Sequence, residues 1–235
     1  MVPGHPPVAR SVGATYVLIH GAGDVGWYWH LVEAALREKG HDVVAPDLPV
    51  DDDSAGLSVY ADVVVEAIGD RDDLVIVGQS FGGYVAPIVC NRRKAMLLVL
   101  VAAMIPAPGE SAEAMFDNTG WAPTLQDDPS DLAIFYHDVD PALAREALAR
   151  GRRQSETPGK EPWPLSAWPD VPTRCVLCRN DRLFPAEWMR RVVRDRLGIT
   201  ADEMDSGHTP ALSHAGELIR RLEEYRVQTS RRVRE

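Results

Sequence analysis

Cysteine is scarce in this sequence. Only three occur among 235 residues, at Cys90, Cys175 and Cys178. An odd number of cysteines without a secretory signal argues against a fold held together by disulfides. Cys175 and Cys178 form a C-x-x-C pair, but they lie in the apolar run RCVLC, which is typical of a strand. Residues three apart in a strand face opposite sides, so we interpret both as buried apolar residues rather than a metal or redox pair.

Long apolar runs and an excess of positive charge are also missing. No stretch reaches the roughly 20 apolar residues of a membrane-spanning helix, and the opening MVPGHPPVARSVG lacks the apolar core of a signal peptide. We therefore expect a cytoplasmic protein. The formal net charge is -10, and an acidic surface repels both nucleic acid and anionic membranes. The composition favours a small uncharged molecule as partner, and it leaves open whether two chains form a homodimer.

The usual sequence patterns for cofactors and metals are absent as well. The sequence contains no phosphate-cradling loop of the Walker type, and no histidine or carboxylate spacing resembles a zinc site. The glycines of GAGDVG at 21–26 suggest a dinucleotide-binding loop, but the following helix has barely begun at that point. We therefore expect neither a cofactor nor a metal.

What the sequence does contain is an alternation of apolar runs and amphipathic stretches, which predicts a doubly wound α/β fold. Runs rich in aliphatic and β-branched residues indicate strands covered on both faces, and strand-helix-strand order implies right-handed crossovers in a mostly parallel sheet. We expect a single domain over 1–235, with about six strands and helices on both faces of the sheet. The expected strands are 15–19, 41–48, 74–78, 95–103, 173–178 and 200–205, and the expected helices are 27–40, 58–70, 81–93, 141–153, 185–198 and 210–227.

This alternation is interrupted between Ala103 and Thr173. The segment from about 104 to 170 is rich in proline, aspartate and tryptophan, with one clear helix at 141–153. We interpret it as a short helical cap inserted into the α/β domain.

A serine among glycines ends the third expected strand. In the stretch GQSFGG, Ser80 lies between Gly78 and Gly82 where strand gives way to helix. G-x-S-x-G at such a junction is the nucleophile-elbow pattern, in which small neighbours let strand and helix approach and the serine takes a strained backbone. We predict that Ser80 is a nucleophile. At the helix N-terminus the Phe81 N–H is then a donor to the oxyanion formed on attack at a carbonyl.

A serine hydroxyl needs a base, which is usually a histidine held by a carboxylate. Asp181 follows a strand in CRNDRLFP, and His208 follows the last strand in DSGHTPALSH. Ligands of parallel sheets bind beyond the carboxyl ends of the strands, and the order serine, aspartate, histidine is the one expected for this architecture. We predict that His208 is the base and Asp181 its orienting partner. Asp205 is too close in sequence to His208 for that role.

The loop after the first strand, IHGAGDVGWYW, is the expected source of a second oxyanion donor. The HG dipeptide lets the backbone turn over the serine, and we predict that the Ala22 N–H is this donor. His20 is interpreted as a structural residue bonded within the loop.

Together the stretches HGAG, GQSFGG, NDRLFP and SGHTPALS resemble the oxyanion loop, elbow, acid loop and histidine loop of the α/β-hydrolase superfamily. The stretches GWYWHLVEAALREKGHDVVAPDL and AAMIPAPGES are similar to its branch of hydroxynitrile lyases and plant methylesterases. The resemblance implies a cofactor-free serine esterase in which Ser80 forms an acyl-enzyme and His208 then activates water. The lyases have threonine and lysine at the positions of Gly21 and Thr209, and both departures favour the esterase, since Thr209 has no positive charge for a leaving cyanide.

Aromatic residues near these loops predict an apolar substrate pocket. We assign Trp29 and Trp121 to it, together with Gly21 and Thr209, although packing explains any single tryptophan more simply. The predicted substrate is a small, largely apolar carboxylic ester or lactone. Two alternatives stay open: a lyase or cyclase that uses the same pocket, and a ligand receptor with this fold.

Overall fold

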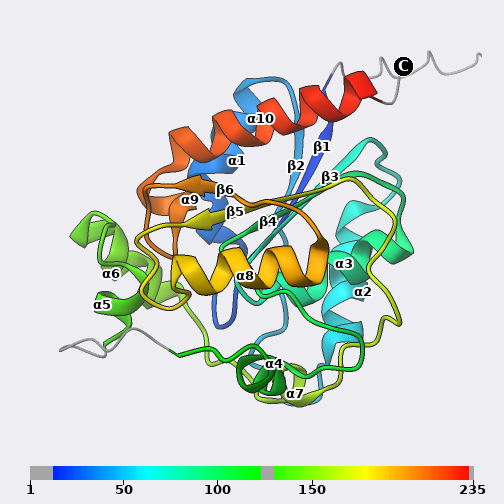
Figure 1. Ribbon diagram of the computed structural model, residues 1–235. Helices are drawn as coiled ribbons and strands as arrows, with labels where there is room; N and C mark the ends of the chain where they lie inside the picture. The colour runs from blue at the N-terminus through cyan, green and yellow to red at the C-terminus, as the bar shows by residue number, and fades with distance from the viewer. Residues whose placement is uncertain (1–12, 123–129, 233–235) are drawn as a thin grey trace, which may run out of the picture.

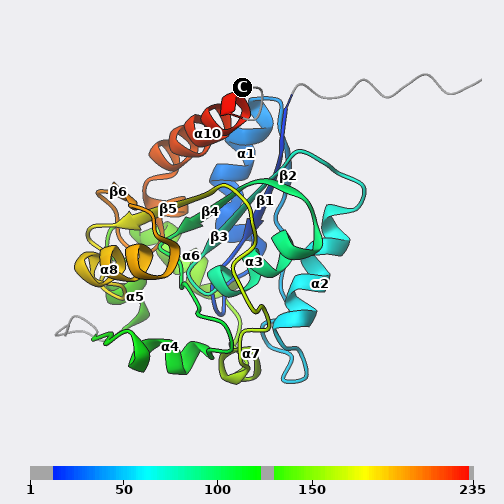
Figure 2. The same ribbon diagram turned by 45° about the vertical axis from the view of Figure 1, so that its right-hand side comes forward.

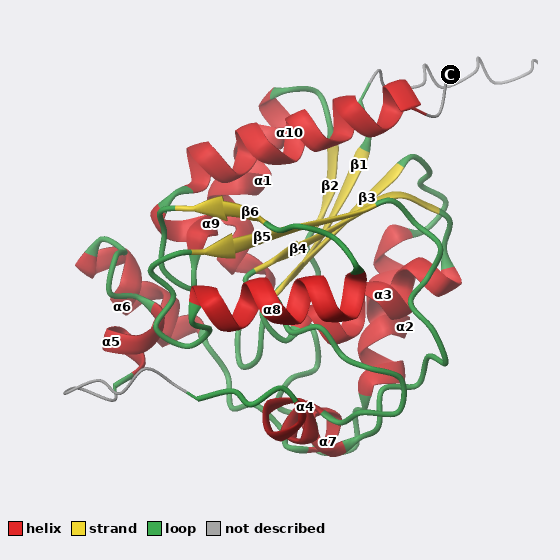
Figure 3. Cartoon of the chain, viewed as in Figure 1, coloured by secondary structure: helices red, strands yellow, loops and turns green. Residues whose placement is uncertain are grey.

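A six-stranded sheet forms the centre of the computed structural model, which describes residues 13–122 and 130–232. The strands lie in the order β2-β1-β3-β4-β5-β6 and each neighbouring pair is parallel (Figure 3), which confirms the predicted doubly wound sheet. Their bounds are β1 Thr15–Ile19, β2 Asp42–Val44, β3 Leu74–Gln79, β4 Ala95–Val101, β5 Thr173–Cys178 and β6 Asp202–Met204. β2 is shorter than the predicted 41–48, because the chain soon reaches Pro46, which has no N–H to donate to a strand.

Helices cover both faces of the sheet (Figures 1 and 2). They are α1 (His30–Glu38) and α10 (Ala215–Arg232) on one face, and α2 (Leu57–Ile68), α3 (Gly82–Arg92) and α8 (Ala186–Leu197) on the other. Alternate residues of β1 point to opposite faces: Val17 and Ile19 pack with α2 and α3, and Tyr16 and Leu18 pack with α1 and α10. Both sets are fully buried, which explains the continuous apolar runs. Over the described residues, none of the helices has the length and apolar character to cross a membrane.

Two of the predicted helices are divided. The helix predicted at 27–40 begins as the 3-10 helix η1 (Gly26–Trp29) and continues as α1. The helix predicted at 210–227 divides at His214 into α9 (Pro210–Ser213) and α10. His214 has a φ of -134°, which lies outside the helical region and turns the chain between the two helices.

The described part of the segment between β4 and β5 contains four short helices rather than the single predicted one. They are α4 (Ala112–Asn118), α5 (Asp131–Phe135), α6 (Pro141–Arg150) and α7 (Thr157–Lys160). α4 and α5 begin after Ser111 and Ser130, whose hydroxyl oxygens accept hydrogen bonds from backbone N–H groups of the first turn. Such caps support helices that are too short for an apolar period to be recognised. In Figure 1, α4 and α7 lie at the bottom and α5 and α6 at the left.

The turn between β3 and α3 brings strand and helix very close together. Ser80 has a φ of 51°, in the left-handed region that residues other than glycine rarely adopt. A Cβ atom on Gly82 would lie 2.8 Å from the Ile19 carbonyl oxygen, and one on Gly83 would lie 2.0 Å from the Met104 carbonyl oxygen. The Ser80 carbonyl accepts a 2.9 Å hydrogen bond from the Met104 N–H. The elbow is therefore held against β1 and the end of β4 by backbone contacts that exclude side chains.

We expect Gly83→Ala to lower the free energy of unfolding by about 2 kcal/mol or more, because the new methyl group meets backbone that has little room to move. The matched control is Gly216→Ala in α10, where nothing lies within 4 Å of the added Cβ. This control should raise the free energy of unfolding by about 0.5–1 kcal/mol. Urea denaturation of the two variants measures both effects. Equal stabilities would show that the close approach at the elbow is not a constraint.

Candidate active site

Three side chains from different loops meet beyond the carboxyl ends of the strands. His208 Nε2 lies 3.0 Å from Ser80 Oγ, and His208 Nδ1 lies 2.7 Å from Asp181 Oδ2. Ser80 follows β3, Asp181 follows β5 and His208 follows β6. All three residues are largely buried, with exposed fractions of 9%, 6% and 3% for Ser80, Asp181 and His208. The structure thus brings together the predicted serine, carboxylate and histidine in the arrangement that nucleophilic catalysis requires.

Backbone N–H groups fix the direction of the Asp181 carboxylate. Its Oδ1 accepts hydrogen bonds from Leu183 N at 2.8 Å and from Phe184 N at 2.9 Å. Oδ2 is left for the His208 ring, so Nδ1 donates to it and Nε2 is free to accept the serine proton.

Two backbone N–H groups beside the serine have no hydrogen-bond partner within the described ranges. They belong to Ala22 and Phe81, the two predicted oxyanion donors. Both residues line the same cavity as Ser80. Phe81 directly precedes α3, so the helix dipole adds to the attraction of its N–H for negative charge. Unpaired donors near the nucleophile are what a developing oxyanion needs.

His20 holds the oxyanion loop from inside the protein. Its ring is fully buried, with Nε2 accepting from Leu48 N at 3.1 Å and Nδ1 donating to the Gly21 carbonyl at 2.9 Å. Burial lowers the pKa of His20 to about 4, so the ring is neutral at pH 7. These contacts fit the structural role predicted for His20.

Gln79 links the elbow to the histidine loop, a role that the sequence does not signal. The side chain is buried, and its Nε2 donates to the His208 carbonyl at 3.0 Å. On its other side, a Cβ atom on Gly21 would lie 2.7 Å from Gln79 Oε1 and 2.9 Å from Ser80 Cβ. Only glycine therefore fits at position 21 without displacing the elbow. The G-x-S-x-G pattern leaves the position of Gln79 unspecified, which is why the pattern gives no indication of this contact.

The inserted segment binds the loops on which the carboxylate and the histidine lie. His137 Nε2 donates to the Asn180 carbonyl at 3.0 Å, and Asp138 Oδ2 accepts from the Gly207 N–H at 2.6 Å. Asn180 and Gly207 directly precede the aspartate and the histidine of the site. The separation of these two loops is thus set partly by residues far away in the sequence.

The site opens into a cavity of about 560 Å³, a size that suits a small molecule. Gly21 and Thr209 line it as predicted, and Thr209 Oγ1 donates to the Phe135 carbonyl at 2.7 Å. The apolar side chains around the opening come from both the sheet loops and the insertion. They include Phe81, Met104, Phe116, Phe135, Leu183 and Phe184.

The structure places the two tryptophans assigned to the pocket elsewhere. Trp29 is fully buried in the core beneath α1 and α10. Trp121 packs against Phe116, with ring centroids 4.5 Å apart, and its Nε1–H donates to the Leu183 carbonyl at 2.9 Å. Neither is among the described residues that line the cavity. Their large apolar area is used in packing, and phenylalanines together with Tyr136 provide the aromatic surface of the cavity.

Within the described residues, no group of three or more histidine, cysteine, aspartate or glutamate side chains is arranged to hold a metal ion. Cys175 and Cys178 are buried in β5 and form no disulfide with a described residue. Burial raises the pKa of Cys175 to about 12, so it behaves as a small apolar residue, as predicted from its place in the strand.

Curated proteins similar to this chain include several named esterases. The chain is 35% identical over 112 residues to "Probable esterase PIR7A" of Oryza sativa subsp. indica, a match that covers 42% of each protein. It is 33% identical over 113 residues to "Carbendazim hydrolyzing esterase" of Nocardioides sp. (strain SG-4G), covering 43% of this chain and 47% of that one. The chain thus spans less than half the length of these two relatives. "Methylesterase 7" of Arabidopsis thaliana matches over 86% of this chain and 92% of its own, at 24% identity.

Solved structures show the same fold. A crystal structure of polyneuridine aldehyde esterase superimposes with a TM-score of 0.76 at 20% identity, covering 90% of this chain and 98% of that one. These likenesses support the resemblance to the branch that contains plant methylesterases. A sequence model of the alpha/beta hydrolase family matches residues 16–221, which is most of the chain, and the protein therefore belongs to this family.

Proposed function

We propose that this protein is a serine esterase that cleaves small, largely apolar carboxylic esters or lactones through an acyl-enzyme. The observation that carries the proposal is the pair of contacts made by His208, at 3.0 Å to Ser80 Oγ and 2.7 Å to Asp181 Oδ2. The unpaired N–H groups of Ala22 and Phe81 and the apolar cavity support it. So do the esterase names of similar proteins.

Acylation begins when Ser80 Oγ attacks the ester carbonyl carbon while His208 Nε2 takes the hydroxyl proton. The carbonyl oxygen becomes an oxyanion, which the Ala22 and Phe81 N–H groups stabilise. Asp181 stabilises the imidazolium that forms. When the tetrahedral intermediate collapses, the bond to the alcohol oxygen breaks and His208 returns the proton to that oxygen.

Deacylation repeats these steps with water. His208 Nε2 takes a proton from water as the water oxygen attacks the acyl carbon, and the oxyanion forms in the same place. Collapse then breaks the bond to Ser80 Oγ, which regains its proton. The products are one carboxylic acid and one alcohol, or one hydroxy acid from a lactone.

The inserted segment acts as the cap of the site in this proposal. Residues 1–235 then form one catalytic domain, with the cap at about 104–170. Met104, Phe116 and Phe135 lie in this segment and line the cavity together with Ser80. The cap therefore shapes the space for the substrate, while its contacts with the acid and histidine loops steady the catalytic groups.

We expect a small fluorophosphonate to add once to the wild-type protein and not to Ser80→Ala, because only an activated serine hydroxyl attacks phosphorus. His208→Ala should react about a thousandfold more slowly, since the base is missing. Intact-mass spectrometry follows the adduct. If folded wild-type protein forms no adduct, the mechanism is overturned. A second experiment uses ¹⁸O-water: ester hydrolysis leaves one labelled oxygen in the acid, whereas a reaction without water leaves none.

Asp138→Ala should lower kcat about tenfold or more with little change in KM, because the Gly207 N–H loses its acceptor and His208 is held less firmly. Asp138→Asn keeps an acceptor oxygen and should stay within about threefold of wild type. The matched control is Asp205→Ala, since Asp205 lies in the loop of Gly207 and His208 but pairs with Arg179 at the surface. Ester kinetics on the three variants test this positioning role, which fails if Asp138→Ala and Asp205→Ala have equal kcat.

A further inference from the structure

Asp24 is a carboxyl group of the oxyanion loop that the proposed mechanism does not use. It lines the same cavity as Ser80 and His208. Its Oδ1 accepts from the Val25 N–H at 2.9 Å, while no described residue donates a hydrogen bond to Oδ2 or forms an ion pair with this group. Burial raises the pKa of Asp24 to about 6, although the Val25 N–H and His208 act in the opposite direction. Among the described residues, neither a lysine nor an arginine pairs with this carboxyl group in the cavity.

The position of this carboxylate is fixed by the inserted segment. The residue before it, Gly23, donates its N–H to Gln154 Oε1 at 2.8 Å, and its carbonyl accepts from the Arg152 N–H at 2.7 Å. Gly23 has a φ of 68°, which directs the chain sharply at this point. Asp24 thus lies on a loop that two hydrogen bonds attach to the inserted segment.

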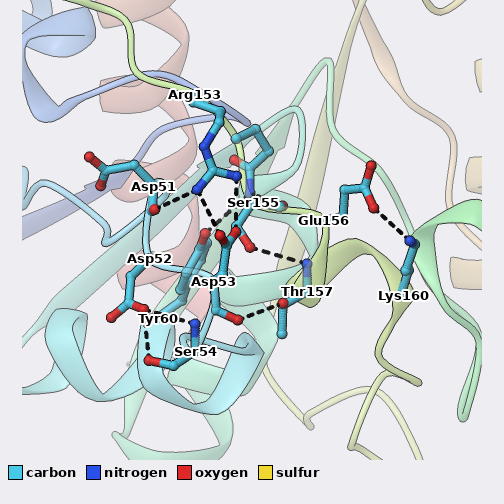
Figure 4. Close-up of polar contacts among 11 residues, drawn as sticks. Asp51, Asp52, Asp53, Ser54, Tyr60, Arg153, Ser155, Glu156, Thr157 and Lys160 are labelled. Atoms are coloured by element: carbon cyan, nitrogen blue, oxygen red, sulfur yellow. Dashed lines mark hydrogen bonds and ion pairs between the residues drawn. The ribbon is translucent and has the colours of Figure 1, made fainter.

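The positive charges near this loop already have partners. Arg152 is the one lysine or arginine among the described residues that line the cavity, and its Nη2 lies 2.8 Å from Asp47 Oδ2. Figure 4 shows Arg153 turned toward Asp53, whose Oδ1 lies 2.9 Å from Nη1. Neither arginine is left to neutralise Asp24.

The other carboxylates of the lining make the cavity more negative still. Lys160 pairs with Glu156 at 2.6 Å (Figure 4), so that carboxylate is compensated. Glu113 and Asp131 are exposed at the rim of the cavity and have no ion pair among the described residues. The lining therefore attracts cations and repels anions.

Aromatic rings accompany Asp24 in the cavity. Burial raises the pKa of Tyr136, and the negative charges of Asp24 and Asp131 raise it further. Phe81, Phe135 and Tyr136 line the cavity with it. A carboxylate and aromatic rings that line one cavity form a combination that suits an ammonium group, because the charge is attracted by both and the N-alkyl groups pack on the rings.

We infer that the esterase selects esters that carry an ammonium group, and that Asp24 is the anionic anchor for this group. The inference rests on the proposed function, and it revises the uncharged substrate that overall composition favours. It also removes a conflict within the site, since a bare carboxylate two residues from Ala22 repels the oxyanion that the Ala22 N–H stabilises. A bound cation neutralises Asp24 and weakens that repulsion.

The test uses two pairs of esters in which a trimethylammonium group is replaced by a tert-butyl group of the same shape. The acyl pair is methyl 4-(trimethylammonio)butanoate and methyl 5,5-dimethylhexanoate. The alcohol pair is 2-(trimethylammonio)ethyl acetate and 3,3-dimethylbutyl acetate. Calorimetry measures binding to Ser80→Ala, which does not turn the esters over, and wild-type kinetics measure kcat/KM separately.

In at least one pair the ammonium ester should bind Ser80→Ala about tenfold more tightly than its neutral partner, as expected for a partly buried charge pair. Adding Asp24→Asn should reduce this preference to under about threefold. The asparagine keeps the acceptor for the Val25 N–H, so the loop is preserved. Asp131→Asn removes the same charge from the rim of the cavity and should leave most of the preference in place.

Equal binding within both pairs, or no binding of either ammonium ester, overturns the inference. An equal loss of preference in Asp24→Asn and Asp131→Asn also overturns it, because the preference then comes from the total negative charge of the cavity rather than from Asp24. These results are independent of catalysis. Wild-type protein that hydrolyses the neutral esters without an ammonium preference keeps the proposed function alone, whereas ammonium-selective binding without any hydrolysis keeps the inference and rejects the esterase.

Discussion

The arrangement of the site depends on one backbone conformation, the left-handed turn at Ser80. A φ of 51° is unfavourable for serine, and it persists because backbone hydrogen bonds to Val101 and Met104 hold the turn in place. Gly82 and Gly83 allow the turn to lie against β1 and the residues after β4, since a side chain there would meet the carbonyl oxygens of Ile19 and Met104. The turn directs Oγ out of the sheet and places the Phe81 N–H beside it. The proposed nucleophile and the proposed oxyanion donor thus depend on the same turn.

The parallel sheet brings the other groups of the proposed triad to that turn. β3, β5 and β6 all run in the same direction, so the loops after them reach one edge of the sheet and need only short distances to meet. Fine positioning comes from contacts between loops. Gln79 binds the His208 carbonyl from the elbow, and Asp138 binds the Gly207 N–H from the insertion. The sheet thus brings the loops close together, and hydrogen bonds between the loops set the final positions of the side chains.

The sequence predicts the arrangement that the sheet imposes, but it does not predict the hydrogen bonds between loops. Strands covered on both faces must be apolar, and a polar residue directly after such a strand lies at the ligand-binding edge of the sheet. The sequence therefore predicts the positions of Ser80, Asp181 and His208. Gln79 and Asp138 act through backbone partners that are distant in sequence, and no local pattern marks them. Aromatic residues suit both pockets and cores, so the sequence pattern places Trp29 in the cavity as easily as in the core. The packing of η1 places it in the core.

Net charge is a similarly coarse guide to what the site binds. The acidic run at Asp51–Asp53 contributes much to the net charge of -10, yet Asp53 is taken up by Arg153, which joins this loop to the insertion. What a ligand meets is the charge that is left without a partner. In the described lining of the cavity that charge includes Asp24, on a loop that the inserted segment holds by hydrogen bonds to Gly23. In our proposal, a single carboxylate without an ion pair in the cavity is therefore a better guide to the substrate than the charge of the whole chain. Desolvation strengthens the field of such a group, and salt screens it less than it screens charges on the surface.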